Sequence, residues 1–166
     1  MNVDSLKNNS LKKSLINHQL TIGSWVSLPS QSITEIMVQV GFPWLVIDLE
    51  HSVIDLETMQ NQILTIESYG KVPLVRLSGK DPVQIKRVLD AGAYGIIAPM
   101  VNTKAEAELM VKAVKYPPIG NRGVGLARAQ GYGMQFERYQ NVINDSSIVI
   151  IQIEQLLSFI IKFSDS

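Results

Sequence analysis

The sequence predicts an α/β fold, a partial TIM (β/α)8 barrel that comprises about the first five β/α units. Apolar segments typical of strands alternate with helical patterns at intervals of roughly 20 to 30 residues, which predicts a parallel sheet. The predicted strand Trp44–Asp48 is apolar up to its last residue, as expected for a parallel strand covered on both faces. Polar residues follow several predicted strands, at the edge where a barrel gathers them into one mouth.

The first half of the chain carries clear local signals for its elements. Ser32, with Glu35 three residues later, is typical of a capping box at a helix start, and Gly41 is typical of a helix end. We therefore predict, in order, a helix over Asn9–Asn17, a strand over Ile22–Leu28, a helix from Ser32 to Gly41, a strand over Trp44–Asp48, a helix over Leu56–Ser68 and a strand over Val72–Leu77.

The second half repeats the pattern with a longer connection. Pro82 suits the first turn of a helix, and Gly92 ends that helix. The further predicted elements are a strand over Tyr94–Met100, a helix over Thr103–Tyr116, a long Gly-rich loop over Pro117–Gly133, a short helix over Phe136–Val142 and a strand over Ile148–Ile153.

Two architectures fit this alternation, an open doubly wound sheet and a (β/α)8 barrel. No Gly-x-Gly-x-x-Gly segment follows the first predicted strand, which argues against dinucleotide binding. Asp48, Arg76 and Glu154 end three of the predicted strands, and in a barrel they would face one mouth. A whole barrel usually needs about 250 residues. The chain has 166, so we expect an incomplete barrel.

Composition narrows the class of protein further. Fifteen basic and fifteen acidic residues balance, which predicts no binding to nucleic acid and none to an anionic membrane. The chain has no Cys, which excludes disulfides and thiolate metal sites and fits a reducing cytoplasm. No apolar run approaches the roughly 20 residues of a membrane-spanning helix, and the first residues lack the apolar core of a signal peptide. We therefore expect a soluble, cytoplasmic protein.

Three groups of residues are candidates for chemistry at the strand ends. His51 closes the segment Asp48–His51 and could exchange protons near neutral pH; the alternative is a solvated loop. Arg76 ends an apolar strand and could stabilise an anionic oxygen; the alternative is an ion pair with Asp48 or Glu50. Gln152 and Glu154 would share one side of a strand, where Glu154 could bind a divalent cation or pair with Arg76.

Two further features depend on the fold for their meaning. Asp90 lies late in a predicted helix and is a surface residue by default, unless the fold brings it under His51. The segment Gly120–Gly125 could bind an anion through backbone N–H groups, or could simply form a tight loop.

Taken together, several segments resemble the HpcH/HpaI aldolase family, in order from about Ile22 to Glu154. The matching segments are Trp44–His51, Pro73–Arg76, Asp81–Lys86, Leu89–Gly92, Ala98–Val101, Tyr116–Pro118, Arg122–Gly125 and Gln152–Glu154. The resemblance implies a metal-dependent (class II) pyruvate aldolase that cleaves a 4-hydroxy-2-oxoacid to pyruvate and an aldehyde. It also implies a small-molecule 2-oxoacid substrate and a barrel that assembles into homo-oligomers, commonly hexamers.

The same resemblance implies a role for each candidate residue. His51 resembles the family's proton-transferring base, and Asp90 the acid that orients it. Arg76 resembles the arginine that stabilises the enolate oxygen. Gln152 resembles a glutamine that contacts the substrate, and Glu154 resembles a ligand of Mg²⁺, Mn²⁺ or Co²⁺.

The chain departs from the family pattern after Glu154. The family's second metal ligand is an aspartate in a Gly-Pro-x-Asp-Leu-Ser-like segment, which this sequence lacks. We therefore expect an incomplete barrel domain over residues 1–154 and an apolar tail over residues 155–166 that does not resemble the family. Two alternatives stay open: a non-catalytic remnant of such an aldolase, and a lyase of the same superfamily that acts on citrate or oxaloacetate.

Overall fold

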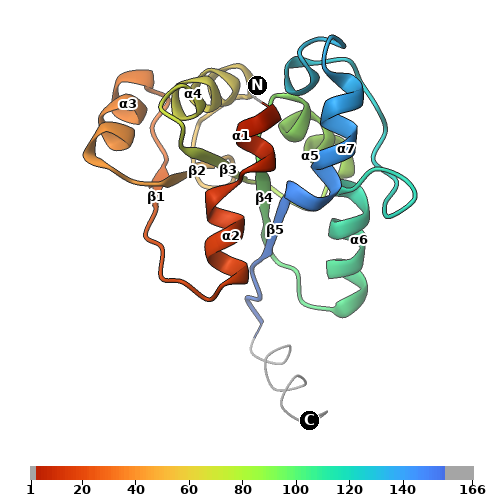
Figure 1. The fold of residues 1–166 in the computed structure, drawn as a ribbon. Helices are drawn as coiled ribbons and strands as arrows, with labels where there is room; N and C mark the ends of the chain where they lie inside the picture. The colour runs from red at the N-terminus through yellow and green to blue at the C-terminus, as the bar shows by residue number, and fades with distance from the viewer. Residues whose placement is uncertain (1–2, 156–166) are drawn as a thin grey trace.

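The computed structural model describes residues 3–155 as five parallel strands with helices packed around them (Figure 1). The predicted tail beyond Gln155 lies outside the described residues. The strands are β1 (Ser24–Val26), β2 (Trp44–Asp48), β3 (Val72–Arg76), β4 (Gly95–Ala98) and β5 (Ile148–Ile151). Each strand pairs only with its neighbours in sequence, in the order β1-β2-β3-β4-β5.

This strand order decides between the two architectures that fit the sequence. A doubly wound sheet reverses its direction of growth at one point, so its spatial order differs from its chain order. Here the order is sequential and every pair is parallel, as in a (β/α) barrel. The predicted fold class, a partial barrel of five strands, is therefore confirmed. Within residues 3–155, β1 and β5 are the edge strands of the sheet.

The helices fall into two groups. Those that connect the strands are α3 (Gln31–Val40), α4 (Leu56–Ser68), α5 (Pro82–Asp90) and α6 (Lys104–Val114). The others are α1 (Val3–Lys7), α2 (Ser10–Ile16), the 3-10 helix η1 (Arg128–Gln130) and α7 (Phe136–Ser146). The connecting helices pack in sequence, α3 on α4 and α5 on α6, whereas α1 packs on α7.

Two apolar cores form because successive strand side chains point to opposite faces of the sheet. Leu45 and Ile47 of β2 belong to the core that contains the connecting helices. Val46, between them, belongs to a second core with Leu6 of α1 and residues of α7. Both faces of the sheet are thus covered, which explains why the strands are apolar throughout rather than alternating.

Local signals located several boundaries correctly. β2 and α4 have the bounds that the sequence predicted. Gly41 ends α3 with a φ of 113°, a left-handed conformation that favours glycine. Pro82 lies in the first turn of α5, and Thr103 with Glu106 forms a capping box at the start of α6.

Other predicted bounds were wrong: β1, β3, β4 and β5 are shorter than the predicted strands, and several helix ends differ. The N-cap of α3 is Ser30, whose Oγ accepts a hydrogen bond from the Ile33 N–H at 3.4 Å, so the predicted capping box of Ser32 does not form. Glu35 instead accepts a hydrogen bond from the hydroxyl of Tyr69, the residue after the end of α4. The predicted helix over Phe136–Val142 is longer, and α1 and η1 were not predicted. No helix within residues 3–155 is long and apolar enough to cross a membrane.

Candidate active site

The carboxyl ends of β2 and β3 are joined by an ion pair between Asp48 and Arg76. The two residues are partners in the strand register and point to the same face of the sheet. Arg76 Nε donates to Asp48 Oδ1 at 2.9 Å, and Arg76 Nη2 donates to Asp48 Oδ2 at 2.6 Å. The Arg76 guanidinium carbon also lies 4.5 Å from the ring centroid of Trp25 on β1. A two-point contact of this kind fixes the plane of the guanidinium.

Both partners of this ion pair are held in their charged forms. Burial raises the pKa of Asp48, but hydrogen bonds from Arg76 and from two backbone N–H groups outweigh it, so that this pKa lies below its ordinary value. The hydrogen bond to Asp48 raises the pKa of Arg76 against the effect of burial, and the charges of Glu50 and Glu154 raise it further. The ion pair with Asp48 that the sequence left open for Arg76 is therefore present, and the role of Arg76 toward an anionic oxygen stays a prediction.

Asp48 also shapes the loop that carries His51. Its Oδ1 accepts hydrogen bonds from the backbone N–H groups of Glu50 at 3.0 Å and His51 at 3.2 Å. Glu50 Oε2 lies 3.4 Å from Arg76 Nε, yet this buried oxygen has no hydrogen bond. His51 Nε2 lies 3.8 Å from the same oxygen, and 73% of the His51 side chain is exposed. The imidazole is therefore open to solvent at the mouth of the sheet.

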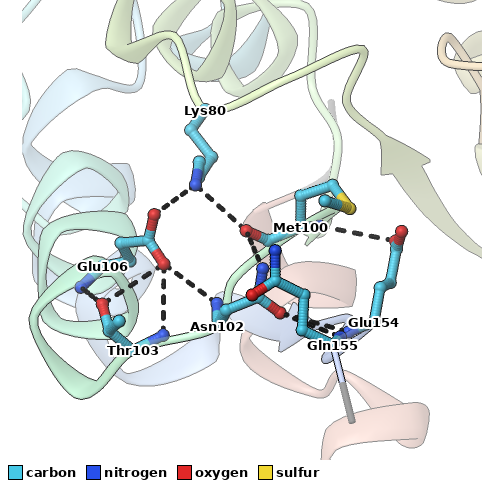
Figure 2. Close-up of polar contacts among 7 residues, drawn as sticks. All are labelled: Lys80, Met100, Asn102, Thr103, Glu106, Glu154 and Gln155. Atoms are coloured by element: carbon cyan, nitrogen blue, oxygen red, sulfur yellow. Dashed lines mark hydrogen bonds and ion pairs between the residues drawn. The ribbon is translucent and has the colours of Figure 1, made fainter. Parts of the chain in front are cut away.

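The end of β5 brings Gln152 and Glu154 to the same mouth. The backbone N–H of Gln152 donates to the Ala98 carbonyl at 2.9 Å, which continues the pairing with β4. Gln152 Oε1 is buried and forms no hydrogen bond with residues 3–155. Glu154 is exposed, and its Oε1 accepts a hydrogen bond from the backbone N–H of Met100 at 3.4 Å (Figure 2). The charge of Glu154 also raises the pKa of Arg76.

Asp90 lies elsewhere in the molecule. α5 starts after the carboxyl end of β3 and ends before the amino end of β4, so its last residue lies at the opposite end of the strands from His51. Asp90 Oδ1 accepts a hydrogen bond from Arg122 Nη2 at 2.6 Å. Within the chain the structure therefore does not bring Asp90 to His51, and the orienting role that the resemblance implies stays a prediction.

The Gly-rich loop is held in place largely by its own backbone. The N–H groups of Gly120, Asn121 and Arg122 donate to carbonyls at the end of α6 and just beyond it, at 3.1, 2.8 and 3.0 Å. The buried Arg122 guanidinium lies 4.8 Å from the ring centroid of Tyr116 and 5.9 Å from that of Tyr139. For these three N–H groups the tight-loop interpretation is therefore correct, since they are not free for an anion.

The oxygen groups at the mouth suit a hard divalent cation, although the described residues supply only part of a site. Glu154 offers an exposed carboxylate, and Gln152 offers an amide oxygen without a partner. No three His, Cys, Asp or Glu side chains within residues 3–155 form a group that could hold a metal ion. Mg²⁺ commonly takes one or two protein carboxylates and completes its shell with water and substrate oxygens. The donors present fit a cation bound in that way.

Sequence reasoning missed the neighbours that hold these side chains. Trp25 was assigned only to a strand, yet its ring lies against the Arg76 guanidinium. Its signal was a tryptophan on β1 one residue before the buried Val26, which places the ring on the face that Arg76 shares. Asn102 and Lys80, which contact the end of β5 and the Met100 carbonyl, carried no recognisable signal.

Comparison with known proteins relates the chain to one family. Residues 21–158 match the family model described as HpcH/HpaI aldolase/citrate lyase. The chain is 42% identical over 149 residues to a 4-hydroxy-2-oxo-heptane-1,7-dioate aldolase of Klebsiella pneumoniae, covering 89% of this chain and 56% of that protein. It is 37% identical over 148 residues to a hydroxypyruvate/pyruvate aldolase of Roseobacter denitrificans, covering 88% of this chain and 57% of that protein.

Solved structures agree with this assignment. A HpcH/HpaI aldolase/citrate lyase family protein from Burkholderia cenocepacia superimposes with a TM-score of 0.82 at 33% identity, covering 89% of this chain and 60% of that one. The citrate synthase SbnG superimposes with a TM-score of 0.78 at 30% identity, covering 93% of this chain and 59% of that one. The chain thus spans little more than half the length of the relatives it matches.

Proposed function

The chain belongs to the HpcH/HpaI aldolase/citrate lyase family. We propose that the carboxyl ends of its strands form part of the active site of a carbon–carbon lyase. The proposed reaction cleaves a 4-hydroxy-2-oxoacid to pyruvate and an aldehyde. The observation that carries the proposal is the Asp48–Arg76 pair, which fixes a guanidinium at the mouth that Gln152 and Glu154 also reach. The names of the Klebsiella and Roseobacter relatives, both aldolases, support the same reaction.

Arg76 would stabilise the negative charge that develops in this reaction. When the bond between C3 and C4 of the substrate breaks, its electron pair forms the enolate of pyruvate and the aldehyde leaves. A preorganised cation beside the enolate oxygen lowers the free energy of that transition state. Arg76 suits this role because Asp48 and Trp25 hold its plane while it keeps its charge.

His51 would move the proton. Its exposed imidazole lies at the same mouth as Arg76 and can reach a solvent-filled space. In the direction of cleavage it would take the proton of the C4 hydroxyl, and a proton returned to C3 of the enolate then gives pyruvate. Histidine suits this task because imidazole exchanges protons near neutral pH.

Glu154 would be the protein's carboxylate ligand for a divalent metal, and Gln152 would contact the substrate through its unpartnered amide oxygen or its NH₂ group. A bound cation would add a second positive charge for the 2-oxoacid oxygens. Oxygen donors of this kind suit Mg²⁺, Mn²⁺ or Co²⁺ and do not distinguish among them. Assembly into a homo-oligomer and a location in the cytoplasm remain predictions from the sequence.

Methyl-proton exchange of pyruvate in D₂O, followed by NMR with added Mg²⁺ or Mn²⁺, tests the proposal. Enolisation of pyruvate is one step of the reaction and does not require the full substrate. We expect exchange that disappears with a chelator and that falls about 100-fold or more in His51→Ala, the loss expected for a general base. Exchange no faster than with the metal alone would contradict the proposal.

The same measurement tests a second candidate, a chain that keeps the fold but does not turn over substrate. The observation that favours it is the small number of metal-binding groups, since no three ligating side chains gather within residues 3–155. If exchange is absent although circular dichroism shows a folded chain, the non-catalytic interpretation is favoured. If pyruvate exchanges but the 4-hydroxy-2-oxoacid is not cleaved, a citrate or oxaloacetate substrate becomes the next test.

A further inference from the structure

We propose that Asn102, supported by Lys80 and Glu106, is a positioning group that holds the Glu154 carboxylate in place as a metal ligand. The three residues come from different segments, and no candidate site derived from the sequence includes them. This inference rests on the proposed function, because it assigns Glu154 the ligand role given above. Figure 2 shows the contacts that join these residues at the carboxyl ends of β4 and β5.

Beyond the end of β5, the Asn102 side chain takes over the hydrogen bonding of the chain from the neighbouring strand. The last backbone hydrogen bond between the segments that continue β4 and β5 runs from the Val101 N–H to the Gln152 carbonyl at 3.0 Å. Beyond it, Asn102 Oδ1 accepts hydrogen bonds from the backbone N–H groups of both Glu154 and Gln155, at 3.3 Å each. The Asn102 side chain therefore determines where the backbone of Glu154 lies.

Met100 supplies the contact to the carboxylate itself. Its φ of 54° lies in the left-handed region, which is uncommon for a residue with a side chain. In this conformation its N–H donates to Glu154 Oε1 at 3.4 Å, and its carbonyl accepts from Lys80 Nζ at 3.0 Å and from Asn102 Nδ2 at 3.4 Å. Strained backbone of this kind persists where the surroundings fix it, and it clusters at functional sites.

Glu106 fixes the other side of Asn102. Its Oε2 accepts hydrogen bonds from the backbone N–H groups of Asn102 at 2.9 Å and Thr103 at 3.1 Å, while its Oε1 forms an ion pair with Lys80. The hydrogen bond from Lys80 lowers the pKa of Glu106 to about 2, with a further contribution from the Asn102 N–H. The capping box with Thr103 already serves the start of α6. The contacts of Lys80 and Asn102 with Met100 and Glu154 are additional to that cap.

Asn102→Ala tests the inference, because it removes both hydrogen bonds to the end of β5. We expect Mn²⁺ affinity, measured by the electron paramagnetic resonance signal of free Mn²⁺, to fall about 10-fold, the low end for losing an outer partner of a metal ligand. Amide hydrogen exchange at Glu154 and Gln155 in the metal-free chain should become faster. The matched control is Glu108→Ala on α6, whose exposed carboxylate pairs within residues 3–155 only with Lys104, at 3.9 Å.

The outcomes separate this inference from the proposed function. Unchanged Mn²⁺ affinity and unchanged amide exchange in a folded Asn102→Ala chain would overturn it, as would an equal loss in the Glu108→Ala control. If the wild-type chain binds no Mn²⁺, the ligand role in the proposed function has failed, and amide exchange alone decides whether Asn102 positions Glu154. Should Asn102→Ala not fold, Lys80→Met removes the contacts to Met100 and Glu106, and the same two measurements apply.

Discussion

Two neighbouring parts of one mouth are built in different ways. At the ends of β2 and β3, Arg76 and Asp48 are mostly buried, with 15% and 6% of their side chains exposed, and they share two short hydrogen bonds. At the end of β5, Glu154 is exposed, and among residues 3–155 its carboxylate has one contact, of 3.4 Å. The first region belongs to the folded core, whereas the second is held by a loop.

The difference suggests how stability and ligand binding are divided. A buried ion pair is costly to break because the remaining charge has no partner. An exposed carboxylate stays available to a ligand because few protein groups compete for its oxygens. We therefore expect substitutions at β2 and β3 to change the free energy of unfolding, and those at β5 to change binding.

The largest expected effect is that of Asp48→Ala. The substitution leaves the Arg76 guanidinium without its two-point partner and removes the acceptor for two backbone N–H groups. We expect the free energy of unfolding to fall by about 3 kcal/mol, as for other buried pairs broken on one side. Urea unfolding followed by circular dichroism measures this. A loss below about 1 kcal/mol, the range of exposed pairs, would remove the contrast between the two regions.

Acid should also weaken the Asp48–Arg76 region. The pKa of Asp48 is lower in the folded chain than its ordinary value, so the unfolded chain binds a proton more readily. Its stabilising contribution is therefore complete above the ordinary aspartate pKa, about 4, and is lost as the pH falls through the folded value. Urea unfolding from pH 6 to pH 3 should show this fall, and Asp48→Asn should reduce it. An equal fall in both chains would assign the acid sensitivity to other carboxyl groups.

Trp25→Phe should have a smaller effect on the same pair. The indole ring lies 4.5 Å from the Arg76 guanidinium carbon but is half exposed, so the cation–π contact contributes about 0.5–1 kcal/mol. Phenylalanine keeps an aromatic face of weaker attraction. We expect a loss of stability at or below about 0.5 kcal/mol in urea unfolding. A loss as large as that of Asp48→Ala would mean that Trp25, and not Asp48, holds Arg76.

Glu154→Ala should have the smallest effect on stability and the largest on metal binding. Among residues 3–155 its exposed side chain accepts one long hydrogen bond, so the free energy of unfolding should change by less than about 0.5 kcal/mol. Titration calorimetry with Mn²⁺ should show that binding is lost. Equal Mn²⁺ affinity in wild type and Glu154→Ala would contradict the ligand role, and a large loss of stability would contradict the comparison between the two regions.

Helix starts show how far local signals extend. Pro82 lies in the first turn of α5, as the sequence predicted, and the helix predicted from Thr103 starts there with a Thr103–Glu106 capping box that was not predicted. At α3 two serines lie two residues apart, and Ser30 forms the cap. Glu35, which would complete the box with Ser32, accepts a hydrogen bond from Tyr69, the C-cap residue of the neighbouring helix α4. Contacts between helices decided what the local pattern left ambiguous.

The sequence by itself determined the order of the strands and of the helices that connect them, the parallel sheet and the polar residues at its carboxyl ends, because periodicity, caps and glycines act over a few residues. Only the tertiary structure decided the partners: Asp48 for Arg76, Arg122 for Asp90, and Asn102 for the backbone of Glu154. These contacts join residues 28, 32 and 52 positions apart. No local pattern encodes such distances, since they depend on how the whole sheet twists and packs.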